Sequence, residues 1–348
     1  MSDLNSATTG IGSLPHHNID SALAYSFLHG IPFLPQIPIR NPWEFMIPQA
    51  LEDLPGLTVE RDGATLLNPE IWASRTAALN ERLATAFRTG KDSPQAFEAF
   101  EPSAATSSSW QAFLWELQEA GKKIAKIQIA GPMTCQWVLR LTDGSGLDKF
   151  PDISSQIFRL VLARSLAMTR RLQAAGITPV LYLDEPGLYA YSAANPRHLA
   201  TIQELKLMVQ TLRKEGVIVG LHCCSNTDWK SVLAMDLSYL SIDTNLSLEN
   251  LLSSASEQLP GFIKRGGRLS LGVIPTGRSS ALHSLDAKEL FEGLKSKLLQ
   301  GLGDPKLVAQ ILRQAIYTPA CGLALHSIAD AELISETLNE VFKYAQNS

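Results

Sequence analysis

The sequence has few cysteines, no long apolar run and no concentration of basic residues. Its 348 residues include four cysteines, and no apolar stretch approaches the length needed to cross a bilayer. No stretch of five or more residues is basic and the formal net charge is −4, which argues against nucleic acid or an anionic membrane as a partner. The first residues lack the basic and apolar regions of a secretory signal. We therefore expect a soluble, cytoplasmic protein whose cysteines are reduced thiols or metal ligands.

The remaining composition is typical of a large α/β protein. Apolar residues make up 45% of the chain and charged residues 18%, enough for a sizeable core. Short apolar runs alternate with helical patterns, and their continuous apolar character suits parallel strands covered on both faces. Eight such runs lie at 9–15, 31–38, 124–132, 178–186, 217–224, 237–244, 268–275 and 316–323. The helical patterns lie at 18–29, 152–175, 196–215, 227–234, 246–264, 287–302, 304–314 and 330–344.

This alternation predicts an α/β fold, a (β/α)8 TIM barrel, as a single domain over residues 1–348. A doubly wound sheet is the weaker alternative, because no glycine-rich dinucleotide loop follows the first strand. Residues 41–121, after the second strand, are predicted to form an insertion on the barrel. It would contain a hairpin over 57–67 and helices over 68–90 and 108–120.

Metal-binding residue types gather where the predicted strands end, which is where a barrel of this kind carries its active site. In the stretch VIVGLHCCSN, strand alternation places His222 and Cys224 on one face and Cys223 on the other. Cys321 and Asp243, at later strand ends, would complete a four-coordinate zinc site. Residue types alone leave a second interpretation open, in which the histidine is hydrogen-bonded inside the barrel and the cysteines fill the core.

Six short motifs occur in a particular order along the chain: IGSLP, GPMT, LDEP, HCC before a later IDT, and PACGL. In this order they resemble the catalytic C-terminal barrel of cobalamin-independent methionine synthase, within the superfamily that includes uroporphyrinogen decarboxylase. The resemblance extends over essentially the whole chain, with the insertion as its weakest part. It implies a single-barrel, zinc-dependent methyltransferase, since the decarboxylases do not use this set of thiolates.

The resemblance implies a role for each matching residue at the metal. The zinc ligands would be His222 and Cys224 of the His-x-Cys pair and Cys321 of PACGL. The fourth ligand of the family is a glutamate, and Asp243 stands at its position with a side chain one methylene shorter. Asp243 would bind the metal directly after a slight shift of its strand, or through water.

The resemblance also implies how the thiol substrate, homocysteine in the first place, would be held. Ile11, Gly12 and Ser13 would bind it through their backbone, and Asp184 of LDEP would bind its amino group and orient it for catalysis. The family carries an acidic residue at the end of the second strand, where the nearest polar residue of this chain is Gln36. That difference weakens the expectation of homocysteine relative to another thiol.

The methyl donor is the least determined part. Trp137 resembles a family tryptophan near the donor, offset by one residue, and an ordinary apolar residue at a loop–helix junction is the alternative. The donor would be methylcobalamin or another methylcorrinoid, free or on a corrinoid protein, or 5-methyltetrahydrofolate. We favour the corrinoid, because this chain is too short to hold the additional N-terminal barrel of the full-length family enzyme.

Three other functions remain open. One is a corrinoid-dependent methyltransferase acting on a different thiol. Another is a zinc-containing binding protein without turnover of its own. A decarboxylase is the most distant of the three.

Overall fold

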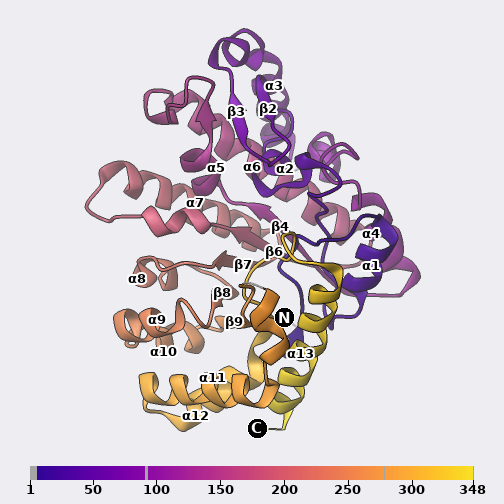
Figure 1. The fold of residues 1–348 in the computed structure, drawn as a ribbon. Helices are drawn as coiled ribbons and strands as arrows, with labels where there is room; N and C mark the ends of the chain where they lie inside the picture. The colour runs from indigo at the N-terminus through magenta and orange to yellow at the C-terminus, as the bar shows by residue number, and fades with distance from the viewer. Residues whose placement is uncertain (1–5, 91–92, 278, 348) are drawn as a thin grey trace.

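The computed structural model describes residues 6–90, 93–277 and 279–347. Its centre is a curled, seven-stranded parallel sheet in the order β1-β10-β9-β8-β7-β6-β4. Helices stand beside these strands, many of them in chain order (Figure 1). The strands are β1 (Ala7–Thr8), β4 (Ile124–Ala130), β6 (Thr178–Asp184), β7 (Ile218–Cys223), β8 (Tyr239–Asp243), β9 (Arg268–Ile274) and β10 (Ile316–Pro319).

Most predicted helices are present, and polar caps define where many of them begin. A side-chain oxygen of Asn, Asp or Ser accepts a backbone N–H at the first turn of α1, α3, α7, α8, α11, α12 and α13. In the described ranges no helix is both long and apolar enough to cross a membrane. The α-helices are α1 (Ile19–Phe27), α2 (Met46–Ala50), α3 (Pro69–Thr89), α4 (Trp110–Glu119), α5 (Pro132–Val138), α6 (Pro151–Ala174), α7 (Pro196–Lys214), α8 (Trp229–Leu233), α9 (Leu248–Ala255), α10 (Gln258–Lys264), α11 (Ala287–Leu302), α12 (Pro305–Gln314) and α13 (Ile328–Gln346).

One helix predicted as continuous, over 246–264, is interrupted. The structure has α9 ending at Ala255 and α10 beginning at Gln258. Pro260 accounts for the break, since its ring would clash with the carbonyl of Ser256 and it cannot donate a helical hydrogen bond.

The prediction of a closed eight-stranded barrel is wrong, because residues 31–38 form no regular strand. The first predicted strand, at 9–15, is also displaced, since β1 lies at Ala7–Thr8. Residues 31–38 lie between β1 and β4, but each side is joined only by an isolated bridge, Phe33 with Lys126 and Ser13 with Gln36. The run IPFLPQIP contains three prolines, which lack the N–H that a ladder requires. The sheet is therefore curled but not closed.

The two faces of the sheet have different characters. Residues such as Leu181 and Leu183 pack in the main core, on the helix-covered face. Val180 and Tyr182, which alternate with them, belong to a small separate apolar cluster on the inner face. Polar side chains also occupy that inner face, on strands buried along most of their length. The interior thus contains polar groups that a purely structural barrel core does not need.

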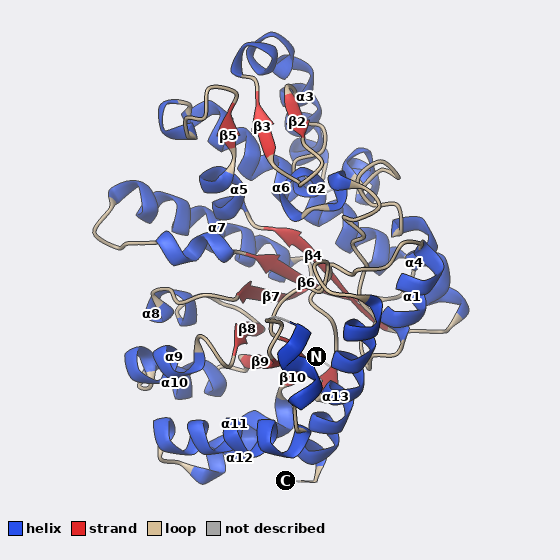
Figure 2. Cartoon of the chain, in the orientation of Figure 1, coloured by secondary structure: helices blue, strands red, loops and turns tan. Residues whose placement is uncertain are grey.

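The predicted hairpin in the insertion is confirmed. Strands β2 (Leu57–Val59) and β3 (Thr65–Leu67) pair antiparallel, and β3 also pairs in parallel with β5 (Arg140–Leu141), which follows α5. This small sheet lies apart from the main one (Figure 2). The division of the chain into a single barrel domain with an insertion over 41–121 stays a prediction.

A buried arginine joins the insertion to the barrel helices. Arg164 of α6 is 1% exposed, and its guanidinium lies 2.8 Å from the Glu52 carboxylate and 3.3 Å from that of Asp53. A buried ion pair is stabilising only while both partners are present. If one partner is removed, the remaining charge is buried without a partner and without hydration.

We expect Arg164→Met to lower the free energy of unfolding by about 3 to 5 kcal/mol, since it leaves Glu52 without its buried partner. Urea unfolding followed by circular dichroism measures this loss. Arg197→Met is the matched control, because Arg197 pairs with Asp148 across an exposed surface and should change stability by roughly 0.5 kcal/mol or less. Equal losses in the two variants would contradict a bridging role for Arg164.

Candidate metal centre

The parallel register of three strands aligns polar side chains at one level of the inner face. Asp184 at the end of β6 pairs with His222 of β7, and His222 pairs with Ser241 of β8. All three side chains are buried. Because directly paired residues in a parallel sheet point to the same side, this register forms a continuous polar row at the carboxyl end of the sheet.

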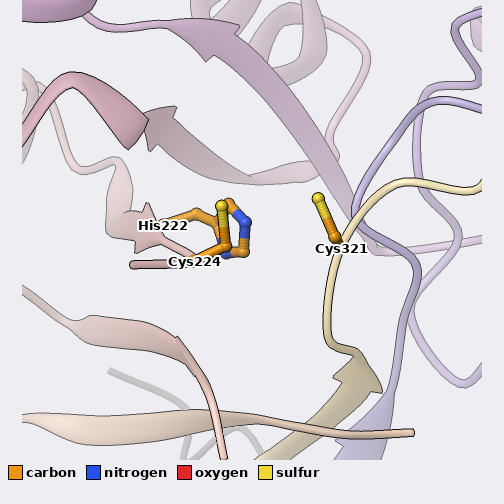
Figure 3. Close-up of side chains that lie close together, drawn as sticks. All are labelled: His222, Cys224 and Cys321. Carbon is orange, nitrogen blue, oxygen red and sulfur yellow. The ribbon is translucent and has the colours of Figure 1, made fainter. Parts of the chain in front are cut away.

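Three of the four predicted metal ligands come together. Ligand atoms of His222, Cys224 and Cys321 all lie within 4.8 Å of one another. His222 and Cys224 come from the end of β7, and Cys321 faces them from the segment after β10 (Figure 3). Their exposure increases from buried His222 through half-buried Cys224 to exposed Cys321. The cluster is therefore open to solvent on the Cys321 side.

Strand alternation sorts the adjacent cysteines as predicted. Cys223 is buried in the main core, on the opposite face from Cys224, and its thiol donates to the carbonyl of Ser225 at 3.2 Å. On the inner face, Nδ1 of His222 hydrogen-bonds Ser241 Oγ at 2.9 Å. That bond orients the ring and leaves Nε2 for the thiols or a metal, as outer contacts do in protein metal sites.

The two thiols are coupled through a hydrogen bond. Cys224 donates to Cys321, which raises the pKa of Cys224, and burial raises it further. The same bond, together with the neighbouring His222, lowers the pKa of Cys321. One thiol of the pair thus loses its proton far more easily than the other, and thiolate is the form that binds metals.

The donor set fits a zinc ion. Zinc prefers thiolate and imidazole ligands, and bond lengths near 2.3 Å to sulfur and 2.0 Å to nitrogen put neighbouring donors about 3.5 to 3.8 Å apart. A cluster within 4.8 Å needs only small side-chain movements to reach that spacing. Three protein ligands also leave a coordination position free, as catalytic rather than structural zinc sites do.

Asp243, the predicted fourth ligand, is not in this cluster of ligand atoms. Its Oδ1 accepts hydrogen bonds from the backbone N–H groups of Asn245 and Leu246, at 2.7 and 3.1 Å. The carboxylate therefore closes the turn that follows β8. Direct ligation by Asp243 stays a prediction.

Asp184 lies beside the cluster with an unsatisfied oxygen. Its Oδ1 is buried and has no hydrogen-bond partner among the described residues. Burial raises the pKa of Asp184 to about 6, while His222 and Lys126 oppose this rise. A buried carboxylate oxygen without a donor is costly, so this atom is suited to receive a donor from a ligand.

The predicted substrate loop, Ile11 to Ser13, adjoins the Cys321 segment. The carbonyl of Ser13 accepts the N–H of Leu323 at 2.8 Å. A Cβ at Gly322 would lie 2.1 Å from Ser13 Oγ, so a larger residue there would require the Ser13 side chain to move. Ile11, Gly12 and Ser13 are thus held next to the metal cluster, although their contact with substrate stays a prediction.

Trp137 of α5 lies away from the cluster, on the wall of a separate cavity of about 840 Å³. Its ring is stacked at a tilt on His198, with ring centroids 4.4 Å apart. None of the three clustered ligands lines this cavity. Of the residues that do line it, Gly187 is the one nearest to Asp184 in the sequence. A donor contact by Trp137 stays a prediction.

Two buried residues at the site were not predicted from the sequence. Ser241, described above, orients the histidine. Lys126 of β4 is 1% exposed on the inner face, with its Nζ 5.0 Å from the Tyr182 ring centroid. The signal for Lys126 was available, because IAKIQIA is a mostly apolar strand whose one charged residue, Lys126, shares the inward face with Gln128.

Comparisons with known proteins identify no family for this chain. No protein-family model and no curated protein matches the sequence. A search of solved structures finds the B12-independent methionine synthase from Shewanella sp. W3-18-1, in complex with selenomethionine. The match has 14% sequence identity and a TM-score of 0.48, and covers 68% of this chain and 67% of that one. A likeness of this degree does not identify the reaction.

We expect one zinc ion per chain, lost in Cys224→Ser and in Cys321→Ser, because each substitution removes a thiolate ligand. Cys223→Ser is the matched control: its side chain faces the core, and a serine hydroxyl can make the same bond to Ser225. Metal content by atomic emission after dialysis measures all three. Equal retention of zinc by the three variants would rule out this ligand set.

Proposed function

We propose that this chain is a zinc-dependent methyltransferase that activates a thiol, homocysteine in the first place, for attack on a methyl donor. The observation that carries the proposal is the cluster of His222, Cys224 and Cys321 at the carboxyl end of the parallel sheet. The motif order described above supports the same reaction. The product from homocysteine would be methionine.

The chemistry requires an ionised sulfur. A free thiol has a pKa near 8.5 and is mostly protonated at neutral pH. A zinc ion held by the three ligands would supply a Lewis acid, and a substrate thiol coordinated to it would be deprotonated at neutral pH. The sulfur then forms a bond to the methyl carbon, the bond between that carbon and the donor breaks with its electron pair left on the donor, and the thiol proton passes to solvent.

The surrounding residues would bind and orient the substrate. Asp184 offers its unpartnered Oδ1 to an amino group beside the metal cluster. The Ile11 to Ser13 loop, joined to the Cys321 segment by the bond between Ser13 and Leu323, would hold the other end of the amino acid. Holding both the sulfur and the amino-acid end of the substrate would keep it in a reactive orientation. Such positioning lowers the entropic part of the barrier to methyl transfer.

A different thiol is the second candidate, and Gln36 favours it. Its amide donates to Gln49 Oε1 at 2.6 Å and carries no charge, where the family has an acid. With Asp184 as the main carboxylate near the cluster, an amino group gains less electrostatic stabilisation than from two acids. Compared with homocysteine, a thiol without an amino group would therefore give up less binding free energy in this site than in a site with two acids.

We expect Asp184→Asn to raise the KM for homocysteine by roughly ten- to a hundredfold, since a charge-assisted hydrogen bond is lost. kcat should fall as well if orientation suffers, while zinc content stays at the parental level. Steady-state kinetics and metal analysis check this. Asp236→Asn, on an exposed carboxylate between α8 and β8, is the control. If Asp184→Asn bound homocysteine with the parental affinity, Asp184 would not be the residue that binds the amino group.

The identity of the methyl donor can be tested by comparing the rates at which different donors give methionine. The net charge of −4 and the lack of a basic run disfavour a folate polyglutamate tail, whereas a corrinoid is mostly uncharged at its methyl face and could sit over the open end of the sheet. We expect faster formation of methionine from methylcobalamin or a methylcorrinoid protein than from methylfolate of any tail length. Turnover with the polyglutamate form and none with either corrinoid would contradict this.

The same assay separates the remaining alternatives. Methyl transfer to another thiol, but not to homocysteine, would support the second candidate. Zinc-loaded protein that methylates no thiol from any donor would contradict the enzymatic proposal and leave a zinc-containing binding protein.

A further inference from the structure

Lys126 is a buried cation in the middle of an apolar strand. Its Nζ donates to the carbonyl of Ile11 at 2.6 Å and to Gln128 Oε1 at 3.0 Å. Burial lowers the pKa of Lys126 to about 8, although the nearby Asp184 opposes this. Replacing a buried charge by an apolar side chain of similar volume is often neutral or stabilising, so stability alone does not account for a lysine here.

The contacts of this residue concentrate where the sheet lacks a regular ladder. Its backbone N–H donates to the carbonyl of Pro32 at 2.8 Å, and its carbonyl accepts the N–H of Leu34 at 2.9 Å. Gln128, two residues along β4, donates to the carbonyl of Leu34 at 2.9 Å. The side chain of Lys126 then crosses to Ile11, so one residue connects β4 to both irregular segments.

The loop after Ile11 depends on close packing against these groups. Gly12 has a φ of 154°, and a Cβ there would lie 2.6 Å from the amide of Gln128 and 2.8 Å from that of Gln36. The loop is in turn bonded to the irregular segment, since Leu14 donates to the carbonyl of Gln36. Inner-face side chains therefore add to the few backbone hydrogen bonds, between Gly12, Leu14 and Gln36, that hold the loop in place of a regular ladder.

We infer that Lys126 is a positioning residue: its ammonium group holds the Ile11 carbonyl so that Gly12 and Ser13 stay beside Cys321, ready to bind the thiol substrate. That the loop binds a thiol substrate rests on the proposed function. That Lys126 holds the loop in position does not depend on it. The Nζ of Lys126 donates to Ile11 and Gln128, so it acts on the substrate through the loop.

The first test is kinetic. Lys126→Met should raise the KM for the thiol by roughly tenfold or more, with kcat within about threefold of the parent and zinc content unchanged. Lys126→Gln keeps a hydrogen-bond donor without the charge, so its KM should lie between those of the parent and of Lys126→Met. It replaces Lys126→Met in the test if that variant does not fold. Lys123→Met, three residues earlier and exposed, is the matched control. A purely structural role would lower stability without this selective change in KM.

The second test needs no activity. Hydrogen exchange should be faster at the Leu14 and Gln36 amides of Lys126→Met, because both amides bond across the loop. In an active parent enzyme, a variant KM equal to the parent's overturns the inference whatever the exchange rates. If the parent methylates no thiol, the proposed function fails, while faster exchange in the variant still supports the positioning role. Unchanged exchange in that case overturns it.

Discussion

The parallel register of β6, β7 and β8 is the constraint on which the site depends. It fixes Asp184, His222 and Ser241 at one level, with each side chain on the inner face. A shift of one residue in β7 would turn His222 and Cys224 toward the helices and bring Cys223 inward. The leucine- and valine-rich outer face prevents such a shift, because it would expose core residues on one side and bury polar ones on the other.

The cysteine pair depends on curvature as well as register. Strands β7 and β10 are separated in the sheet by β8 and β9, which in a flat sheet would put them about 14 Å apart. Cys321 reaches Cys224 because the sheet curls and because its side chain points from the segment after β10 toward the end of β7 (Figure 3). The opposite shifts of the two thiol pKa values, upward for Cys224 and downward for Cys321, are a consequence of that approach.

The proline-rich segment between β1 and β4 has a structural cost and a functional use. Three prolines in residues 31–38 prevent regular pairing, so the barrel stays open at this point. Side chains on β4, Lys126 and Gln128, provide the hydrogen bonds that a ladder would otherwise supply. A loop held in this way can take the close packing of Gly12, which a regular strand could not accommodate.

The sequence by itself determined the α/β class, most helix bounds, the hairpin over 57–67 and the sorting of Cys224 from Cys223. Each follows from a local rule: apolar period, polar caps, turn residues and strand alternation. Local rules did not decide that Asp243 hydrogen-bonds the turn after its own strand, or that Lys126 reaches the carbonyl of Ile11. Those outcomes depend on which backbone groups remain unpaired when the sheet curls, and only the tertiary structure decides that, because such partners lie far apart along the chain.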